Sequence, residues 1–551
     1  MPTGADLIAS ALADAGVEVA FGLPGTHNLA LWRALGATRV RVVGTRHEQA
    51  AAAAADGYAR ASGRLGVVMV TTGPGAANTL GAVGEAWASG TPLLVIATDI
   101  ATTLRRPGIY RGALHETPDQ AGMFAPVTKA TVRVAKPAEL YAAVQMAVFT
   151  AADAPTRPVY LEVPTDLLSA DVGSGHLRAD IDDARLHLPD PADAAAAVQL
   201  LEGARRPLVW AGGGALRAGA GPAVGELATR LAAPVLTTYG ARGLLGAGHP
   251  CAVDLPPHVP QVGALWDDAD VVVAIGTDFD GSMTQNWRQP PPRALVTVNL
   301  DPADAAKAYS PTLSLVADAR LGTETLADLL GPPADAAALE ALRTRLDAVR
   351  QQVRADLAAL EPQALAFLDR VGEALPAHAT VLADMCIAGY WYAGFGAVAG
   401  PRRLAYPVGW GTLGFAFPAA LGAALGGPGP VLSISGDGGF LMASGELATA
   451  AQEELPLTAL VVDDGGYGML RFDQQRAGDP PAGVDLASPD FAALAGASGV
   501  PAETVDGFGE DFRSALEAQL ARPGPSLLAV RARLTPPPTT SPRWYRPGSA
   551  P

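Results

Sequence analysis

Short apolar runs that end in glycine-rich or polar stretches recur along this chain. Clear examples are residues 66–70, 158–164, 380–383, 431–434 and 457–462. Each run has the length of a buried strand, and the stretches between runs are long enough to hold helices. This alternation predicts parallel sheets covered by helices, so the expected fold class is α/β.

The same alternation divides the chain into three units. We expect three Rossmann-like parallel-sheet domains at residues 1–170, 190–333 and 361–532, followed by a Pro-rich tail at 533–551. An Asp-rich linker should join the first two domains. A charged helical stretch near 334–360 should precede the third. Strands of the central domain are expected near 207–211, 234–238, 270–275 and 294–299.

Composition agrees with a large globular protein of several domains. The 551 residues are too many for one hydrophobic core, and 49% of them are apolar against 17% charged. The formal net charge of −16 disfavours nucleic acids and acidic membranes as partners. Two cysteines, Cys251 and Cys386, cannot make a disulfide framework. The N-terminus lacks signal-peptide features and no apolar run has membrane length, so we expect a cytoplasmic protein.

Acidic and glycine residues follow two of the predicted strands. Gly436-Asp437-Gly438 comes after residues 431–434, and residues 463–468 (Asp-Asp-Gly-Gly-Tyr-Gly) come after 457–462. The ends of two parallel strands can hold one divalent metal and one diphosphate between them. A helix is expected to start near Leu441. A Gly-Asp-Gly triplet alone would more often be a plain turn.

Together the two clusters resemble the signature of thiamine diphosphate enzymes, in which Gly-Asp-Gly is followed some two dozen residues later by Asn-Asn. The resemblance implies that Mg²⁺ is bound by Asp437, Asp464 and the carbonyl of Gly466. It also implies cofactor contacts from Gly436, Gly438, Gly439, Tyr467 and Gly468. Here Asp463-Asp464 stands where Asn-Asn is commonest, and a second carboxylate still suits Mg²⁺.

The N-terminal third resembles the pyrimidine-binding domain of the acetolactate synthase branch of these enzymes. The similar stretches are residues 46–49, 56–63 and 71–78. The essential glutamate of the family falls on Glu48, whose carboxylate would lie against the aminopyrimidine ring and promote deprotonation of the thiazolium carbon. Asn78 is a further implied cofactor contact. The alternative for Glu48 is a solvated charge at a helix start.

Residues 407–418 resemble the segment that bends the cofactor. The resemblance implies that the Gly411 carbonyl accepts a hydrogen bond from the exocyclic amine and that Leu413 is the apolar wedge. Leu413 could equally be a core residue, and both roles are compatible. Residues 384–387 (Asp-Met-Cys-Ile) follow a strand and match a loop that touches the diphosphate, mostly through its backbone, so Cys386 and Ile387 are implied cofactor contacts.

The central domain contains Gly212-Gly213-Gly214 after a strand, which could be mistaken for a dinucleotide loop. Acetolactate synthases that hold FAD carry two arginines in the stretch that matches residues 276–282, and both are missing here. We therefore expect no bound FAD.

The substrate end departs from acetolactate synthases. Asp473 stands near the position of a tryptophan that selects the acceptor, and His115 replaces a glutamine. His27 and His115 are candidate proton donors, since histidine titrates near neutral pH, although both could be structural. Thr26 and Thr71 are candidate substrate contacts.

Three acidic residues occur at or near positions where relatives have other residues: Asp473, Glu116 and Asp278. A buried carboxylate cluster is costly without a cation, so a 2-oxo acid with a guanidino or amino tail is a plausible substrate. Alternatively these acids face solvent or pair with Arg471, Arg105 or Arg111.

The resemblance implies thiamine diphosphate- and Mg²⁺-dependent decarboxylation of a 2-oxo acid, with the activated aldehyde released or ligated. Acetolactate synthase is the main alternative, and a flavin-linked oxidase or an inactive cofactor-binding homologue is another. Glu48 and Asp437 lie on different units, which in relatives meet across a subunit interface. A homodimer or dimer of dimers is therefore expected.

Overall fold

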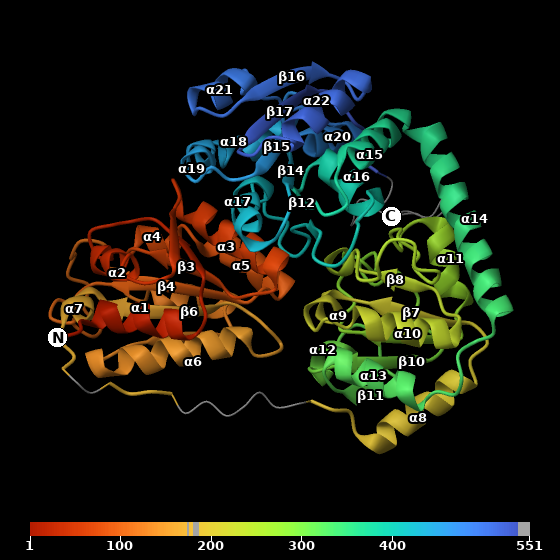
Figure 1. Cartoon of the computed structure of the whole chain (residues 1–551), viewed down its shortest axis with the longest axis horizontal. Coiled ribbons are helices and arrows are strands. Elements are labelled where there is room, and N and C mark those ends of the chain that lie inside the picture. Colours follow the sequence, from red (N-terminus) through yellow and green to blue (C-terminus); the bar gives the residue numbers. More distant parts are fainter. Residues whose placement is uncertain (174–175, 180–186, 538–551) are drawn as a thin grey trace.

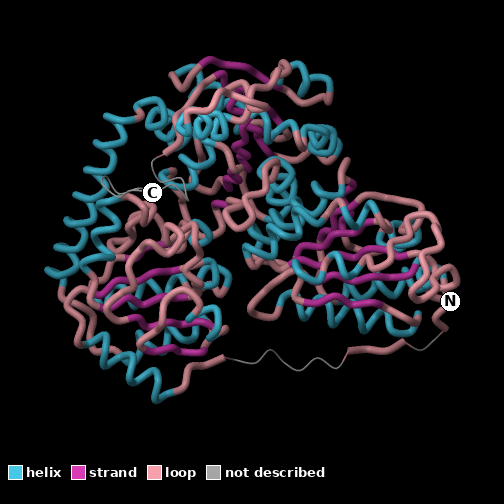
Figure 2. The backbone as a smooth tube through the Cα atoms, turned by 180° about the vertical axis from the view of Figure 1, so that it is seen from behind, coloured by secondary structure: helices cyan, strands magenta, loops and turns pink. Residues whose placement is uncertain are grey.

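The computed structural model describes residues 1–173, 176–179 and 187–537, and it consists of three α/β domains, each built on a parallel sheet (Figure 1). The predicted fold class is therefore confirmed. Figure 2 shows the three sheets from behind, with helices on their faces. The expected linker between the first two domains and the Pro-rich tail lie partly outside the described residues.

The N-terminal domain holds a six-stranded sheet in the order β2-β1-β3-β4-β6-β5. Its strands are β1 (Val19–Gly22), β2 (Arg41–Gly44), β3 (Gly66–Val70), β4 (Leu93–Asp99), β5 (Ala130–Arg133) and β6 (Val159–Pro164). Its helices are α1 (Gly4–Asp14), α2 (Leu29–Leu35), α3 (Glu48–Ser62), α4 (Pro74–Ala77), α5 (Leu80–Ser89), α6 (Leu140–Ala152) and α7 (Thr165–Ser169).

The central domain holds a five-stranded sheet in the order β11-β10-β9-β7-β8. Its strands are β7 (Pro207–Ala211), β8 (Val235–Thr237), β9 (Val271–Ile275), β10 (Leu295–Asn299) and β11 (Leu313–Val316). Its helices are α8 (Pro191–Glu202), α9 (Gly213–Arg217), α10 (Gly221–Leu231), α11 (Pro260–Asp268), α12 (Pro302–Ala306) and α13 (Ala319–Leu329). The long helix α14 (Ala336–Leu360) leads from it to the third domain.

The C-terminal domain holds a six-stranded sheet in the order β13-β12-β14-β15-β17-β16. Its strands are β12 (Thr380–Ala383), β13 (Leu404–Ala405), β14 (Val431–Gly436), β15 (Leu457–Asp463), β16 (Ala502–Asp506) and β17 (Ser526–Arg531). Its helices are α15 (Pro362–Ala374), α16 (Ile387–Phe395), α17 (Ala416–Gly426), α18 (Asp437–Leu441), α19 (Leu447–Gln452), α20 (Gly468–Ala477), α21 (Phe491–Ala497) and α22 (Glu510–Leu520).

The first and third sheets have the same strand order when each is numbered from its own first strand. In such sheets the connections turn to opposite sides between two neighbouring strands, and ligands bind at the carboxyl ends of those strands. In the N-terminal domain this point lies between β1 and β3, and in the C-terminal domain between β12 and β14. The candidate residues of the sequence gather at both points.

Helices α3 and α17 bind the N-terminal and C-terminal domains together, as seen where they lie side by side in Figure 1. Their surfaces are rich in alanine and glycine, so the backbones approach closely. A Cβ atom on Gly57 would overlap the carbonyl of Ala419, and one on Gly422 would overlap the carbonyl of Ala54. The alanine run of α3 is thus explained by close helix packing.

One sequence expectation about local structure is wrong. Helix α18 begins at Asp437, four residues before the predicted start at Leu441. Gly436 is in an extended conformation and occupies the N-cap position, so the glycines after Asp437 belong to the first turn. Among the described residues, no helix is long and apolar enough to cross a membrane.

Candidate active site

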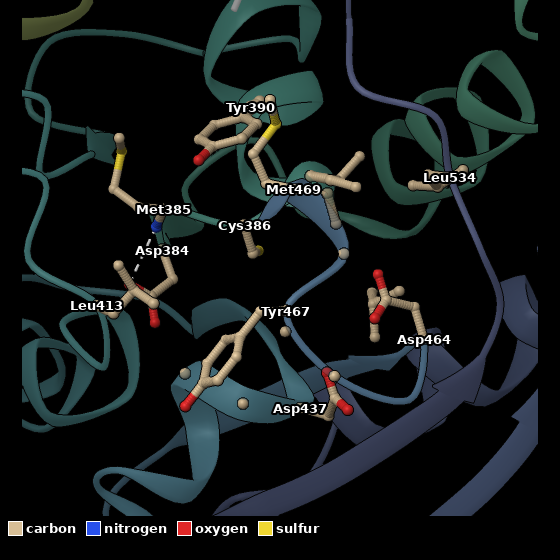
Figure 3. A pocket seen from close by; sticks show the side chains of 18 of the residues that line it. Asp384, Met385, Cys386, Tyr390, Leu413, Asp437, Asp464, Tyr467, Met469 and Leu534 are labelled. Carbon is tan, nitrogen blue, oxygen red and sulfur yellow. Dashed lines mark hydrogen bonds between the residues drawn. The ribbon is translucent and has the colours of Figure 1, made fainter. Parts of the chain in front are cut away.

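A cavity opens at the carboxyl ends of β12, β14 and β15 in the C-terminal domain (Figure 3). The residues that line it include the predicted Leu413, Cys386, Ile387, Gly436, Asp437, Gly438, Gly439, Asp464, Gly466, Tyr467 and Gly468. They come from four separate stretches of sequence. The structure therefore brings together the residues that the sequence assigned to the diphosphate and the metal.

Two carboxylates face this cavity with unsatisfied oxygens. Asp437 receives a hydrogen bond on Oδ2 from Ser488 Oγ at 2.9 Å, whereas its Oδ1 is buried without a hydrogen-bond partner. Asp464 Oδ1 is likewise buried without one, although an Arg471 nitrogen lies 3.6 Å away. Burial and the neighbouring Asp437 raise the pKa of Asp464 to about 6, and burial raises that of Asp437. A divalent cation would offset this unfavourable arrangement.

The glycines of the cavity leave room that side chains would fill. A Cβ atom on Gly438 would lie 2.6 Å from the Tyr467 ring, and one on Gly439 would lie 2.8 Å from the Asp384 carboxylate. Gly466 has φ +145°, a conformation open only to glycine, and a Cβ there would overlap the Val484 carbonyl. These positions form a backbone cradle of the kind that approaches a phosphate group closely.

The donor set fits Mg²⁺ bound together with a diphosphate. Among the described residues no group of three or more His, Cys, Asp or Glu could hold a metal by itself. Two carboxylates therefore need backbone and ligand oxygens to complete a six-coordinate shell. Asp463, the unusual acid of the second cluster, accepts hydrogen bonds from Ser488 Oγ and the Gly465 N–H, so it orders the turn.

Glu48 is the first residue of α3 and is 8% exposed. Asn78 Nδ2 donates a hydrogen bond to Glu48 Oε2 at 3.0 Å. The backbone just before Glu48 is held by the C-terminal domain, because Glu446 Oε1 accepts the N–H groups of Arg46 and His47 at 2.9 and 3.0 Å. Glu48 is therefore a fixed, buried carboxylate, unlike a solvated charge at a helix start.

The two histidines meet at the carboxyl ends of β1 and β3. Their ring centroids are 5.2 Å apart, and His27 Nδ1 lies 2.8 Å from Thr72 Oγ1. Burial, and secondarily the neighbouring His115, lower the pKa of His27, which favours its neutral form. His115 has φ +66° and a buried Nδ1 without a hydrogen-bond partner. The buried hydroxyl of Thr71 also lacks one, while Thr26 is exposed.

The three acids considered for a cationic substrate do not converge. Glu116 Oε2 accepts the N–H groups of Arg111 and Ala113 and so closes its own loop. Asp278 pairs with Lys307 at 2.7 Å in the central domain. Neither acid uses the arginine side chains suggested from the sequence. Asp473 lies on α20, a helix with no buried residue, beside the cavity-lining Met469 and Leu470.

The glycine-rich turn of the central domain has a packing explanation. Cβ atoms on Gly212 or Gly214 would come within 2.5 and 2.8 Å of the Gly276 carbonyl, where the ends of β7 and β9 touch. Phe279, in the stretch where FAD-binding relatives carry arginine, is buried and packs against Trp210 and Tyr309.

Two buried carboxylates at the site have side-chain contacts that the sequence did not predict, although Asp384 begins the loop expected to touch the diphosphate. Glu85 of α5 is completely buried, and its Oε2 accepts the N–H groups of residues 410–412. Asp384 follows β12 and accepts the N–H groups of Gly414 and Phe415. An acid within the apolar segment 80–88 was the available signal for Glu85, since charges seldom lie on a buried helix face without a partner.

Sequence comparisons agree with this geometry. Three profiles match: "Thiamine pyrophosphate enzyme, N-terminal TPP binding domain" over residues 2–123, the central domain of the same enzymes over 194–329, and their C-terminal TPP binding domain over 384–530. Thiamine pyrophosphate is another name for thiamine diphosphate. The chain belongs to the thiamine diphosphate-dependent enzymes.

Individual relatives place it in one branch of that family. The chain is 37% identical to "Probable 2-ketoarginine decarboxylase AruI" of Pseudomonas aeruginosa, over 96% of this chain and 94% of that protein. It is 32% identical to a probable acetolactate synthase large subunit of Methanocaldococcus jannaschii, over 91% and 87%. It is 30% identical to the acetolactate synthase isozyme 3 large subunit of Escherichia coli, over 91% and 89%. The protein is thus an acetolactate synthase-like enzyme.

Proposed function

We propose that this enzyme uses thiamine diphosphate and Mg²⁺ to decarboxylate a 2-oxo acid with a cationic tail, 2-ketoarginine (5-guanidino-2-oxopentanoate) being the first candidate. The observation that carries the cofactor assignment is that buried Oδ1 atoms of Asp437 and Asp464 lack hydrogen-bond partners beside the glycine cradle. The substrate class rests on the similarity to a 2-ketoarginine decarboxylase. Asp473 is the candidate partner of the cationic tail.

Each group has a defined task in the proposal. Asp437, Asp464 and the Gly466 carbonyl hold the metal, and Gly436, Gly438, Gly439, Cys386, Ile387, Tyr467 and Gly468 surround the diphosphate. Gly411 and Leu413 would contact the cofactor, which would supply the electron sink for loss of carbon dioxide. Glu48, whose orientation is fixed by the hydrogen bond from Asn78, would exchange a proton with the aminopyrimidine ring.

Loss of carbon dioxide leaves a carbon that must gain a proton before an aldehyde can leave. The net reaction consumes one 2-oxo acid in its carboxylate form and one proton and yields one aldehyde and one carbon dioxide. His27 and His115 are the proposed proton donors, because they lie together where the N-terminal sheet ends. Thr71, whose hydroxyl lacks a hydrogen-bond partner, and Thr26 are proposed to contact the substrate.

We also propose a homodimer, or a dimer of dimers, whose sites form between chains. The cavity is lined by C-terminal residues, while Glu48 belongs to the N-terminal domain. Large apolar side chains are exposed beside the candidate site residues of both domains. Leu29 and Leu114 lie next to the two histidines, and Met442 and Leu470 lie next to the cavity. Such exposed side chains favour burial against a second chain. A cytoplasmic location is proposed on the two free cysteines, and FAD is not expected.

Acetolactate synthase remains a second candidate because several relatives at 30–32% identity carry that name. The deciding experiment incubates the purified protein with thiamine diphosphate, Mg²⁺ and 2-ketoarginine, pyruvate or benzoylformate. Carbon dioxide and product mass are followed. We expect 2-ketoarginine to be consumed fastest, with 4-guanidinobutanal or a ligation product appearing. Preferential conversion of pyruvate to acetolactate would replace the proposal with the second candidate.

A further inference from the structure

The loop 410–415, which carries Gly411 and Leu413, is wrapped around a carboxylate from another domain. Glu85 Oε2 accepts the N–H groups of Trp410 and Gly411 at 3.1 Å and that of Thr412 at 3.5 Å. Glu85 belongs to α5 of the N-terminal domain and has no exposed surface. A buried carboxylate that accepts several backbone N–H groups holds them strongly. Its removal costs free energy because the buried N–H groups lose their acceptor.

The other oxygen of Glu85 is occupied within its own domain. Ser89 Oγ donates to Oε1 at 2.9 Å, and an Arg60 nitrogen lies 3.5 Å from it. Arg60 also pairs with Asp56 and stacks on the Phe415 ring at the far end of the loop. The charge of Glu85 is therefore balanced away from the loop, which leaves Oε2 for the three backbone groups.

A second buried carboxylate holds the opposite end of the loop. Asp384 accepts the N–H groups of Gly414 at 3.0 Å and Phe415 at 3.4 Å. Gly411 and Gly414 have φ of +71° and +72°, so the backbone turns at both ends in a conformation that favours glycine. The wedge residue Leu413 lies between the two anchored ends and lines the cavity.

We propose that Glu85 is a positioning residue that fixes the Gly411 carbonyl and the Leu413 side chain against the cofactor without touching it. This inference rests on the cofactor roles given to Gly411 and Leu413 under the proposed function. Without an acceptor at Oε2, three N–H groups would turn toward other partners and the loop would lose its shape. The N-terminal domain thus shapes the cofactor loop of its own chain.

The loop can be disturbed independently through Gly84, the neighbour of Glu85 on α5. The Trp410 ring covers Gly84, and a Cβ atom there would overlap this ring. Gly84→Ala would therefore displace the Trp410 ring at the start of the loop without changing any charge. Because α5 is helical at this position, alanine is otherwise well tolerated there.

The test compares Glu85→Leu, which removes the acceptor, with Glu85→Gln, which keeps an acceptor oxygen. Calorimetry gives the Kd for thiamine diphosphate with Mg²⁺, and kinetics at saturating cofactor give kcat and KM. For Glu85→Leu and Gly84→Ala we expect the cofactor Kd to rise about tenfold and kcat to fall, with KM for the 2-oxo acid unchanged. Glu85→Gln should stay within about threefold of wild type.

Ser89→Ala is the matched control, since it removes the hydrogen bond to the other oxygen of Glu85. It should retain the wild-type cofactor Kd. Wild-type cofactor affinity in Gly84→Ala and Glu85→Leu would overturn the inference, as would an equal loss in Ser89→Ala. If Glu85→Leu does not fold, Glu85→Asp, whose carboxylate is withdrawn from the loop by one methylene, is measured in its place, and a wild-type cofactor Kd in that variant would likewise overturn the inference. Failure of wild-type protein to bind thiamine diphosphate would instead refute the proposed function.

Discussion

Asn78 Nδ2 donates a hydrogen bond to Glu48 Oε2 at 3.0 Å, and this contact fixes the orientation of a buried carboxylate at the start of α3. Glu446 holds the two residues before it from the other domain. The carboxylate is thus oriented before any cofactor arrives, as proton transfer requires.

Glu48→Gln should fold and bind thiamine diphosphate nearly as wild type does, while kcat falls by about 10²–10⁴-fold. The amide keeps the size of the side chain and cannot take the proton-transfer role. Steady-state kinetics and calorimetry of cofactor binding check both halves of this expectation. Gln49→Ala, one residue along the helix, should keep wild-type turnover. Near-normal kcat in Glu48→Gln would refute the assignment.

Asp437→Asn and Asp464→Asn should each raise the Mg²⁺ concentration needed for half-maximal activity by about tenfold or more, because each removes a charged ligand. Chelator-treated wild-type protein should lose activity and regain it with Mg²⁺. Asp463→Asn is the control, since that side chain orders the turn through Ser488 and Gly465. An unchanged Mg²⁺ requirement in both ligand variants would exclude the metal site.

Two inactive variants should complement each other if the site forms between chains. In a mixed dimer of Glu48→Gln and Asp437→Asn, one site carries both substitutions and the other carries neither. Random re-association of equal amounts should restore about a quarter of wild-type activity. The mixture is dissociated, re-associated and assayed against each variant alone. No recovery, although mixed dimers are detected by mass, would place both residues in a site within one chain.

Asp473→Asn should lower kcat/KM for 2-ketoarginine about tenfold, the loss expected when a guanidinium loses a charged partner, and leave pyruvate unaffected. Glu116→Gln is the control because that carboxylate closes its own loop. Both substrates are assayed with each variant. Equal losses of kcat/KM for both substrates would show that Asp473 does not recognise the cationic tail.

His258 should make stability depend on pH. Burial lowers the pKa of this side chain to about 4, and its Nε2 lies 2.7 Å from the Ser282 carbonyl. Between pH 6.5 and 4 the His258 side chain binds a proton in the unfolded state but not in the folded state. The contribution of neutral His258 to the unfolding free energy is therefore complete above pH 6.5 and is lost as the pH falls toward 4.

Relative to His258→Gln, wild type should therefore lose on the order of 2 kcal/mol of unfolding free energy between pH 7 and pH 4.5. The glutamine amide can still donate to Ser282. Urea unfolding of both proteins across this pH range gives the difference, and His378→Gln serves as an exposed control. A difference that does not change with pH would contradict the neutral buried form.

Local sequence determined much of this protein. Apolar runs such as 431–434 and 457–462 indicated buried parallel strands, because strands covered by helices on both faces are apolar throughout. A strand is followed directly by Gly436, Asp437, Gly438 and Gly439. Their position at the carboxyl edge of the sheet could therefore be predicted from the order of residues in the sequence. The family resemblance added the expected role of Glu48.

Other features depend on contacts between segments far apart in sequence, and only the tertiary structure decided them. The spacing of Asp473, Glu116 and Asp278 could not reveal that Glu116 closes its own loop or that Asp278 meets Lys307. Glu85 and the loop at 410–412 are separated by more than 300 residues, yet they share hydrogen bonds. A buried charge takes its role from its partners, and those partners are set by how the domains pack.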